Sequence, residues 1–182
     1  MADSINEIAN WGWTGDEYEG RAVRQLVTPI YLTLYNQTLT SAGLVIKGAG
    51  NTLAKAGSAF YATVAGKVVT KTANTDMAAL SGTVTNAKFN VFVFYIDSAG
   101  TLTSKMGVEG ASLAAVTFPQ PAVNVAPIGF VIINPTGTGN FVGGTTNLDD
   151  ATVVPNAVYV NTPFPFNPWK VNQLCNGVTG PT

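Results

Sequence analysis

One stretch of the chain, KFNVFVFYI at residues 88–96, constrains the fold more than any other. It is rich in aromatic and β-branched residues and runs into the turn sequence DSAG at 97–100, so it predicts a strand followed by a tight turn. Alternation divides its side chains into two apolar faces, one with Phe92, Phe94 and Ile96 and the other with Phe89, Val91, Val93 and Tyr95. A strand with one face exposed to solvent would carry polar residues at every second position. We therefore expect this strand to be covered on both sides.

The composition favours many short strands. Charged residues make up 10% of the chain, whereas about 25% is usual, and Gly (19) and Pro (10) occur throughout. Such a chain is poor helix material and predicts an all-β fold. We expect an antiparallel β-sandwich or a jelly-roll-like barrel of about eight strands with an extended N-terminal arm. The low charge also indicates a protein that is permanently assembled with others.

The first residues differ from the rest, and they divide the chain into an arm over 1–28, a β domain over 29–168 and a tail over 169–182. Residues 1–24 carry five acids against two arginines, a net charge of −3, while the remainder has seven lysines against five acids, a net +2. Aromatic anchors beside arginine are typical of interface hot spots. The arm therefore predicts a docking segment, although packing on its own domain is an alternative. The anchor candidates are Trp11, Trp13, Tyr18, Arg21 and Arg24.

Local patterns predict the individual elements. A second doubly apolar run, PIGFVIIN at 127–134, is expected to pair with the 88–96 strand at the centre of the fold. A hairpin is expected over 59–70, with Ala65 and Gly66 at its turn. Helices are expected over 4–10, from a capping-box pattern, and over 74–80, where Thr75 or Asp76 could cap and Gly82 would stop the helix. Further strands are expected at 30–35, 44–47, 101–106, 115–118 and 157–160.

The chemistry that the sequence carries does not favour an enzyme, and we expect no cofactor and no metal. There is no histidine, and Cys175 is the only cysteine, which removes the usual partners of nucleophilic and metal catalysis. The glycine-rich loops lack the third glycine of a dinucleotide-binding fingerprint. Asp149, Asp150 and Asn147 with nearby carbonyls could hold calcium, but a turn or helix cap explains the same residues more simply.

The expected partners are proteins. The lysines of the main body are isolated, so a nucleic-acid partner is not expected. No stretch approaches the roughly 18 consecutive apolar residues of a transmembrane helix, and the N-terminus has no basic region with an apolar core behind it. We expect synthesis in a host cytoplasm and no membrane partner.

Four stretches carry a resemblance to a known class: NTDMAAL at 74–80, FNVFVFYID at 89–97, IGFVIIN at 128–134 and FVGGTTNLD at 141–149. Over roughly residues 40–162 the chain resembles the β-rich cement, decoration and head-fibre proteins of tailed bacteriophages. The resemblance implies a virion protein on the outer capsid surface, often a trimer, with arms that reach the major capsid protein or sister subunits. In that reading a sister subunit covers one face of the 88–96 strand, so Phe89, Val91, Val93, Tyr95, Phe92 and Phe94 are candidates for a subunit interface or a core strand.

Two alternatives stay open. The chain could be a carbohydrate-binding module of a head or tail fibre that attaches to host glycans, with exposed aromatic platforms drawn from Tyr31, Tyr35, Phe164, Phe166 and Trp169. It could also be a tail or collar component that uses the same interfaces elsewhere on the particle.

Overall fold

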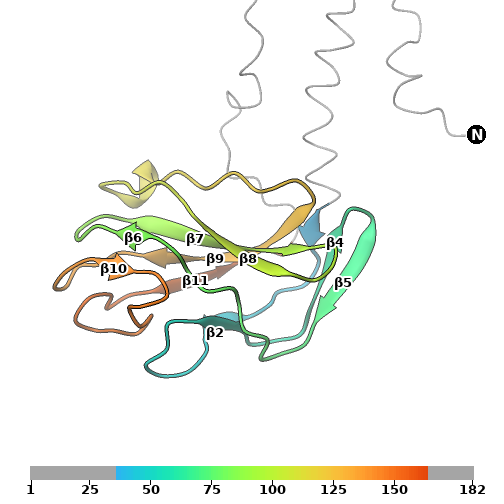
Figure 1. Cartoon of the computed structure of the whole chain (residues 1–182), viewed down its shortest axis with the longest axis horizontal. Coiled ribbons are helices and arrows are strands. Elements are labelled where there is room, and N and C mark those ends of the chain that lie inside the picture. Colours follow the sequence, from blue (N-terminus) through green and yellow to red (C-terminus); the bar gives the residue numbers. More distant parts are fainter. Residues whose placement is uncertain (1–35, 164–182) are drawn as a thin grey trace, which may run out of the picture. The chain divides into compact units, whose positions relative to one another are not determined.

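The computed structural model describes residues 36–163, all within one compact unit. In this range every strand pairing is antiparallel and there is no α-helix, only a single turn of 3-10 helix, η1 (Leu113–Ala115). The prediction of an all-β antiparallel fold is confirmed, and the arrangement is consistent with a sandwich (Figure 1). The strands are β1 (Gln37–Thr38), β2 (Leu44–Ile46), β3 (Ala54–Ala56), β4 (Phe60–Val64), β5 (Lys67–Lys71), β6 (Thr83–Val84), β7 (Asn90–Asp97), β8 (Leu102–Met106), β9 (Val125–Ile133), β10 (Phe141–Val142) and β11 (Val158–Asn161).

Several expectations lie outside the described residues. They are the arm and tail boundaries at 28 and 168, the helix over 4–10 and the strand over 30–35.

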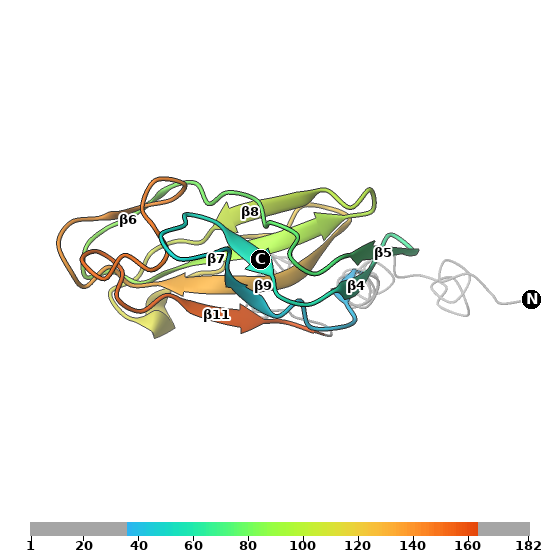
Figure 2. The same ribbon diagram turned by 90° about the horizontal axis from the view of Figure 1, so that it is seen from below.

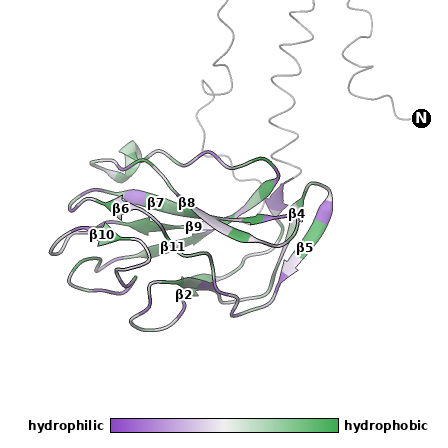
Figure 3. Cartoon of the chain, viewed as in Figure 1, coloured by the Kyte–Doolittle hydropathy of each residue, from purple (hydrophilic) through white to green (hydrophobic). Residues whose placement is uncertain are grey.

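Strand β7 lies inside a four-stranded sheet with the order β11-β9-β7-β8, and Figure 2 shows these strands side by side. It pairs with β9 from Asn90 opposite Ile133 to Asp97 opposite Val125. The predicted pairing of the two doubly apolar runs is therefore confirmed. Both strands are mostly green, and so hydrophobic, in Figure 3, with a purple part on β7.

A bulge interrupts this pairing. Phe94 lies opposite Gly129 but Tyr95 lies opposite Pro127, so Ile128 is an extra residue on β9. Proline has no N–H to donate to a neighbouring strand, and it is tolerated where the ladder is already broken. The bulge thus explains how Pro127 can occupy an interior strand.

The remaining strands form three small sheets, with the orders β1-β4-β5, β2-β3 and β10-β6. They pack on one face of the central sheet, and the main hydrophobic core lies between the two layers. Phe92 and Phe141 meet there edge to face, with ring centroids 5.8 Å apart. The largest fully buried side chains of this core are Phe60, Phe92, Phe94, Phe141, Ile96, Ile128 and Ile133.

The predicted hairpin is confirmed as β4 and β5. At its two-residue turn Ala65 has φ 50° and Gly66 has φ 77°. Positive φ at both central residues is the type I′ geometry, whose twist matches that of the flanking strands.

The helix expected over 74–80 is wrong. The segment is extended and pairs with β3: Met77 N–H donates to the Ala54 carbonyl at 2.9 Å, and the Thr75 carbonyl accepts from the N–H of Ala56 at 2.9 Å. The apolar spacing that suggested a helix serves instead to bury Met77 and Leu80, each 3% exposed, in the main core. Pairing with a neighbouring strand satisfied the backbone and overrode the local propensity.

Candidate functional site

The second face of β7 is covered by the same chain. Val91, Val93 and Tyr95 are 1%, 1% and 2% exposed and form a second hydrophobic cluster with Phe130. We call residues 111–124, which link β8 and its following turn to β9, the strap; Figure 1 shows it in yellow above the central sheet. The partly buried side chains that pack against this cluster are Val116 and Phe118 of the strap, with Val125, Ile132 and Val160.

Polar and aromatic contacts hold the strap against the sheet. The Tyr95 hydroxyl donates a hydrogen bond to the Pro119 carbonyl at 3.1 Å, and the Lys105 ammonium donates to the Gln120 carbonyl at 3.1 Å. The rings of Phe118 and Phe130 meet edge to face with centroids 5.0 Å apart, a favoured aromatic geometry. Burial under the strap raises the pKa of Tyr95 well above its ordinary value.

This arrangement corrects one expectation. A sister subunit is not needed to cover the second face, because a single chain already buries Val91, Val93 and Tyr95. These residues, with Phe92 and Phe94, occupy a core strand, while Phe89 is half-buried and bridges to Gly110. The homotrimer itself stays a prediction.

Sequence reasoning missed the strap as a structural layer. The strand expected over 115–118 forms only a single bridge, between Thr117 and Val108. The available signal was the apolar alternation of Val116 and Phe118 just before the prolines at 119 and 121. The same alternation is expected for a strand paired in a sheet and for an unpaired segment that packs one side on a sheet. It does not distinguish the two.

The carboxylate of Asp97 fixes the turn that follows β7. The Asp97 carboxylate accepts the N–H groups of Ala99 and Thr101, both at 2.8 Å, and Gly100 has φ 83°. The turn predicted at 97–100 is confirmed. The Thr101 N–H contributes most to lowering the pKa of Asp97 below its ordinary value, because it stabilises the ionised form.

Glu109 joins two loops. Its carboxylate accepts the N–H of Thr85 at 2.9 Å and the hydroxyl of Thr85 at 3.0 Å. These bonds, the backbone one first, and then the charge of Lys88 lower the pKa of Glu109. The Glu109 carboxylate therefore links the 85–88 loop to the 107–110 turn by two hydrogen bonds.

The adjacent acids Asp149 and Asp150 serve different partners. Asp149 accepts the N–H of Gly50 at 2.8 Å, whereas Asp150 accepts the N–H and the hydroxyl of Thr152 at 2.9 and 2.6 Å. The Thr152 hydroxyl is the main cause of the lowered pKa of Asp150. Within residues 36–163 no group of three His, Cys, Asp or Glu side chains could hold a metal ion. Asp150 therefore fixes the local turn that follows it, whereas Asp149 joins its loop to the separate loop of Gly50.

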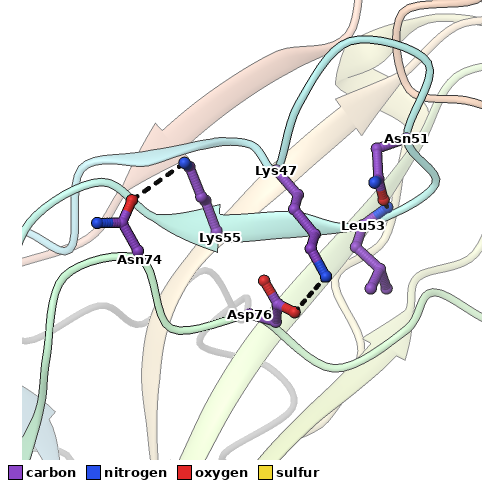
Figure 4. A network of polar contacts seen from close by, with 6 residues as sticks. All are labelled: Lys47, Asn51, Leu53, Lys55, Asn74 and Asp76. Carbon is purple, nitrogen blue, oxygen red and sulfur yellow. Dashed lines mark hydrogen bonds and ion pairs between the residues drawn. The ribbon is translucent and has the colours of Figure 1, made fainter.

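The fifth acid of the described domain lies on the surface beside β2 and β3. Asp76 accepts a bond from the Lys47 ammonium at 2.6 Å, and Lys55 donates to the Asn74 side-chain oxygen at 3.0 Å (Figure 4). The Lys47 and Asp76 side chains are about 40% exposed (41% and 42%), and exposed pairs of this kind contribute about 1 kcal/mol at most. This network ties the extended 74–77 segment to its neighbours.

The remaining predicted site residues lie outside the described part of the chain. They are the anchor candidates Trp11, Trp13, Tyr18, Arg21 and Arg24, and the glycan-platform candidates Tyr31, Tyr35, Phe164, Phe166 and Trp169.

Comparisons with known proteins found no matching family model, no similar curated protein and no similar solved structure. Among the described residues, no helix is long and apolar enough to cross a membrane.

Proposed function

We propose that this chain is a virion structural protein of a tailed bacteriophage, a cement or decoration protein that binds the outer surface of the assembled capsid. The observation that carries the proposal is how the described domain uses its charged groups. All five of its acids accept hydrogen bonds or an ion pair from the same domain: Asp76, Glu109 and Asp149 from separate segments, and Asp97 and Asp150 from their own turns. A compact β domain whose carboxylates are bonded within the domain suits a structural part, and the resemblance to phage cement proteins points the same way.

The physical effect follows from mass action. A protein that binds the assembled shell but not its dissociated subunits shifts the equilibrium toward intact particles. At a free concentration one hundred times the Kd, each occupied site contributes about 2.7 kcal/mol. Many equal sites on an icosahedral shell would sum to a large stabilisation without any catalytic chemistry.

The direct test adds the purified protein to shells that lack it. We expect saturable binding by co-sedimentation and a higher temperature of shell disassembly. Removal of residues 1–24 should leave a folded β domain, shown by a cooperative thermal unfolding transition, that no longer binds at full occupancy. If the unmodified chain does not bind shells, the proposed function is wrong.

A further inference from the structure

Strand β5 has an edge to which no other described segment is bonded. It is the outer strand of the β1-β4-β5 sheet, and Figure 1 shows it at the margin of the domain beyond β4. The outer strands of the central sheet differ, because each has another segment against it. The Ser104 hydroxyl of β8 donates to the Ala79 carbonyl at 2.7 Å, and the Asn161 side chain of β11 accepts the N–H of Leu44 at 2.9 Å. Within residues 36–163, no backbone hydrogen bond joins the outer edge of β5 to a further segment.

The hairpin register fixes which backbone groups of β5 face outward. The two-residue turn closes between Val64 and Lys67, and hydrogen-bonded and non-hydrogen-bonded pairs alternate from there along the strands. Val68 and Thr70 fall at the non-hydrogen-bonded positions, so they direct their N–H and carbonyl groups away from β4. Two donors and two acceptors are therefore open along this edge.

The contacts of β4 agree with this register. Tyr61 lies opposite Thr70 and directs its own backbone groups toward β1. Its N–H donates to the Thr40 hydroxyl at 3.0 Å, and its carbonyl accepts the N–H of Leu39 at 2.8 Å. Because the backbone groups of Tyr61 point away from β5, those of Thr70 point away from β4.

The side chains of β5 alternate between two faces of the sheet. On one face Val69 is half-buried and packs against the main core, with Lys67 and Lys71 on either side of it. The other face carries Val68, which is 70% exposed and lies diagonal to Tyr61 of β4, itself 50% exposed. The edge therefore presents an apolar position between two cations on one face and an exposed apolar pair on the other.

The two lysines of β5 have no acidic partner within the described part of the chain. The ion pair found there joins Lys47 to Asp76, and neither Lys67 nor Lys71 forms a hydrogen bond. The five acids of the domain are bonded elsewhere. The two lysines are four residues apart, about 13 Å along a strand. Carboxylates with the same spacing on a paired strand would lie opposite them, an arrangement that stabilises cross-strand pairs.

The charges of β5 argue against a second copy of this strand as its occupant. In the antiparallel register that pairs all five residues of two copies, Val69 lies opposite Val69 and each Lys67 lies opposite a Lys71. Like charges directly opposite each other are destabilising, and lysine on an edge strand is a usual guard against self-pairing. The same two lysines favour a strand of opposite charge.

We propose that β5 is a docking edge for an extended segment of another protein with the pattern acid-x-apolar-x-acid, where x is any residue, and that this segment adds a fourth strand to the β1-β4-β5 sheet. Its backbone pairs with Val68 and Thr70, its apolar residue lies beside Val69, and its carboxylates lie opposite Lys67 and Lys71. In strand addition the main-chain bonds supply affinity and the alternate side chains supply specificity. The proposal does not rest on the proposed function, because the edge belongs to the described domain and the test uses no capsid shells.

The test titrates the ¹⁵N-labelled full chain with two capped synthetic peptides, TETVTET and TQTVTQT, and follows the amide chemical shifts. The peptides share their length and central valine, can pair in either direction because their sequences are palindromic, and differ in two charges. We expect the shift changes to centre on β5, and the Kd of TETVTET to be at least threefold lower than that of TQTVTQT. The difference should shrink at high salt, which screens exposed charges.

Amide hydrogen exchange distinguishes strand addition from simple charge attraction. In the free protein the N–H groups of Val68 and Thr70 should exchange fast, whereas that of Val69, which is bonded to β4, should exchange slowly. Saturation with TETVTET should slow exchange at Val68 and Thr70 severalfold and leave Val69 unchanged. Unchanged exchange at Val68 and Thr70 in the bound protein would overturn the proposal.

Variants separate the charges from the edge. Lys67→Gln with Lys71→Gln should abolish the preference for TETVTET, while the control Lys55→Gln with Lys88→Gln, which removes the same net charge away from β5, should keep it. Thr70→Pro removes an outward N–H that makes no bond within the domain, a position where an edge strand tolerates proline. We expect it to weaken both peptides at least threefold with little change in the thermal unfolding midpoint.

Several outcomes would contradict the docking edge. Equal Kd values for the two peptides, or a preference lost equally in the control variant, would overturn the acidic partner. Shift changes centred away from β5 would overturn the site. A dimer of the unmodified chain in analytical ultracentrifugation that Thr70→Pro converts to a monomer would identify a second copy as the occupant. None of these results bears on the binding of the chain to shells, so the proposed function is judged separately.

Discussion

The substitution Val93→Ala tests whether the strap truly closes the second face of β7. Val93 is 1% exposed and packs in the cluster with Val91, Tyr95 and Phe130. Removing two methyl carbons costs about 1.6 kcal/mol of transfer free energy at about 0.8 kcal/mol per buried carbon. The cavity left under the strap adds less than about 1 kcal/mol. We expect the free energy of unfolding to fall by about 2 kcal/mol.

The matched control is Val68→Ala. Val68 lies on β5, and its side chain is 70% exposed, so the same chemical change there should alter stability by less than about 0.5 kcal/mol. Both variants are unfolded in urea and followed by far-UV circular dichroism, with the slope against denaturant expected to be unchanged. In a thermal scan the Val93→Ala loss corresponds to about 4–8 °C for a chain of this size.

Two results would refute this reasoning. A Val93→Ala loss no larger than that of Val68→Ala would show that the second face is not closed. A wild-type midpoint that rises with protein concentration, with the Val93→Ala loss appearing only at high concentration, would show that a second subunit and not the strap provides the cover.

Three further predictions use the same assay. Tyr95→Phe removes the hydroxyl that holds the strap and should cost about 1 kcal/mol. Gly137→Ala should destabilise strongly, because a Cβ there would overlap the Thr152 carbonyl, while Gly48→Ala, where a Cβ meets no atom within 4 Å, should be neutral. The folded protein lowers the pKa of Asp97 and of Glu109, so the unfolded chain binds protons at these two carboxyl groups more readily. The stability that the two carboxylates contribute is therefore complete above their ordinary pKa values of 3.8 and 4.5. It is lost as the pH falls through their lower pKa values in the folded protein.

Each of these has a contrary outcome. A Tyr95→Phe protein as stable as the wild type would mean that the hydroxyl bond to the strap adds nothing. Equal stability of the two glycine variants would contradict the close approach at residue 137. The roles given to these carboxylates would be contradicted if the thermal midpoint stayed constant as the pH was lowered below about 4.5. An equal decrease in a double variant with Asp97→Asn and Glu109→Gln would also contradict them.

The strand pattern was readable from the sequence because it depends on local alternation and turn chemistry. The two doubly apolar runs, the turn at Asp97 and the hairpin turn at Ala65 and Gly66 all appear where the residues predict them. In each case the decisive information, a period of two and a turn residue, lies within a few neighbouring positions.

Tertiary structure decided what those neighbours could not. The apolar spacing of Met77 and Leu80 fits a helix, yet the backbone there pairs with β3 because an edge was available. The 88–96 run showed that both faces of β7 must be buried, but not that residues 111–124 would fold back as the strap. Which segment covers a face of a strand, and which strand pairs with it, depends on contacts between residues far apart in the sequence. A local sequence pattern contains no information about these contacts.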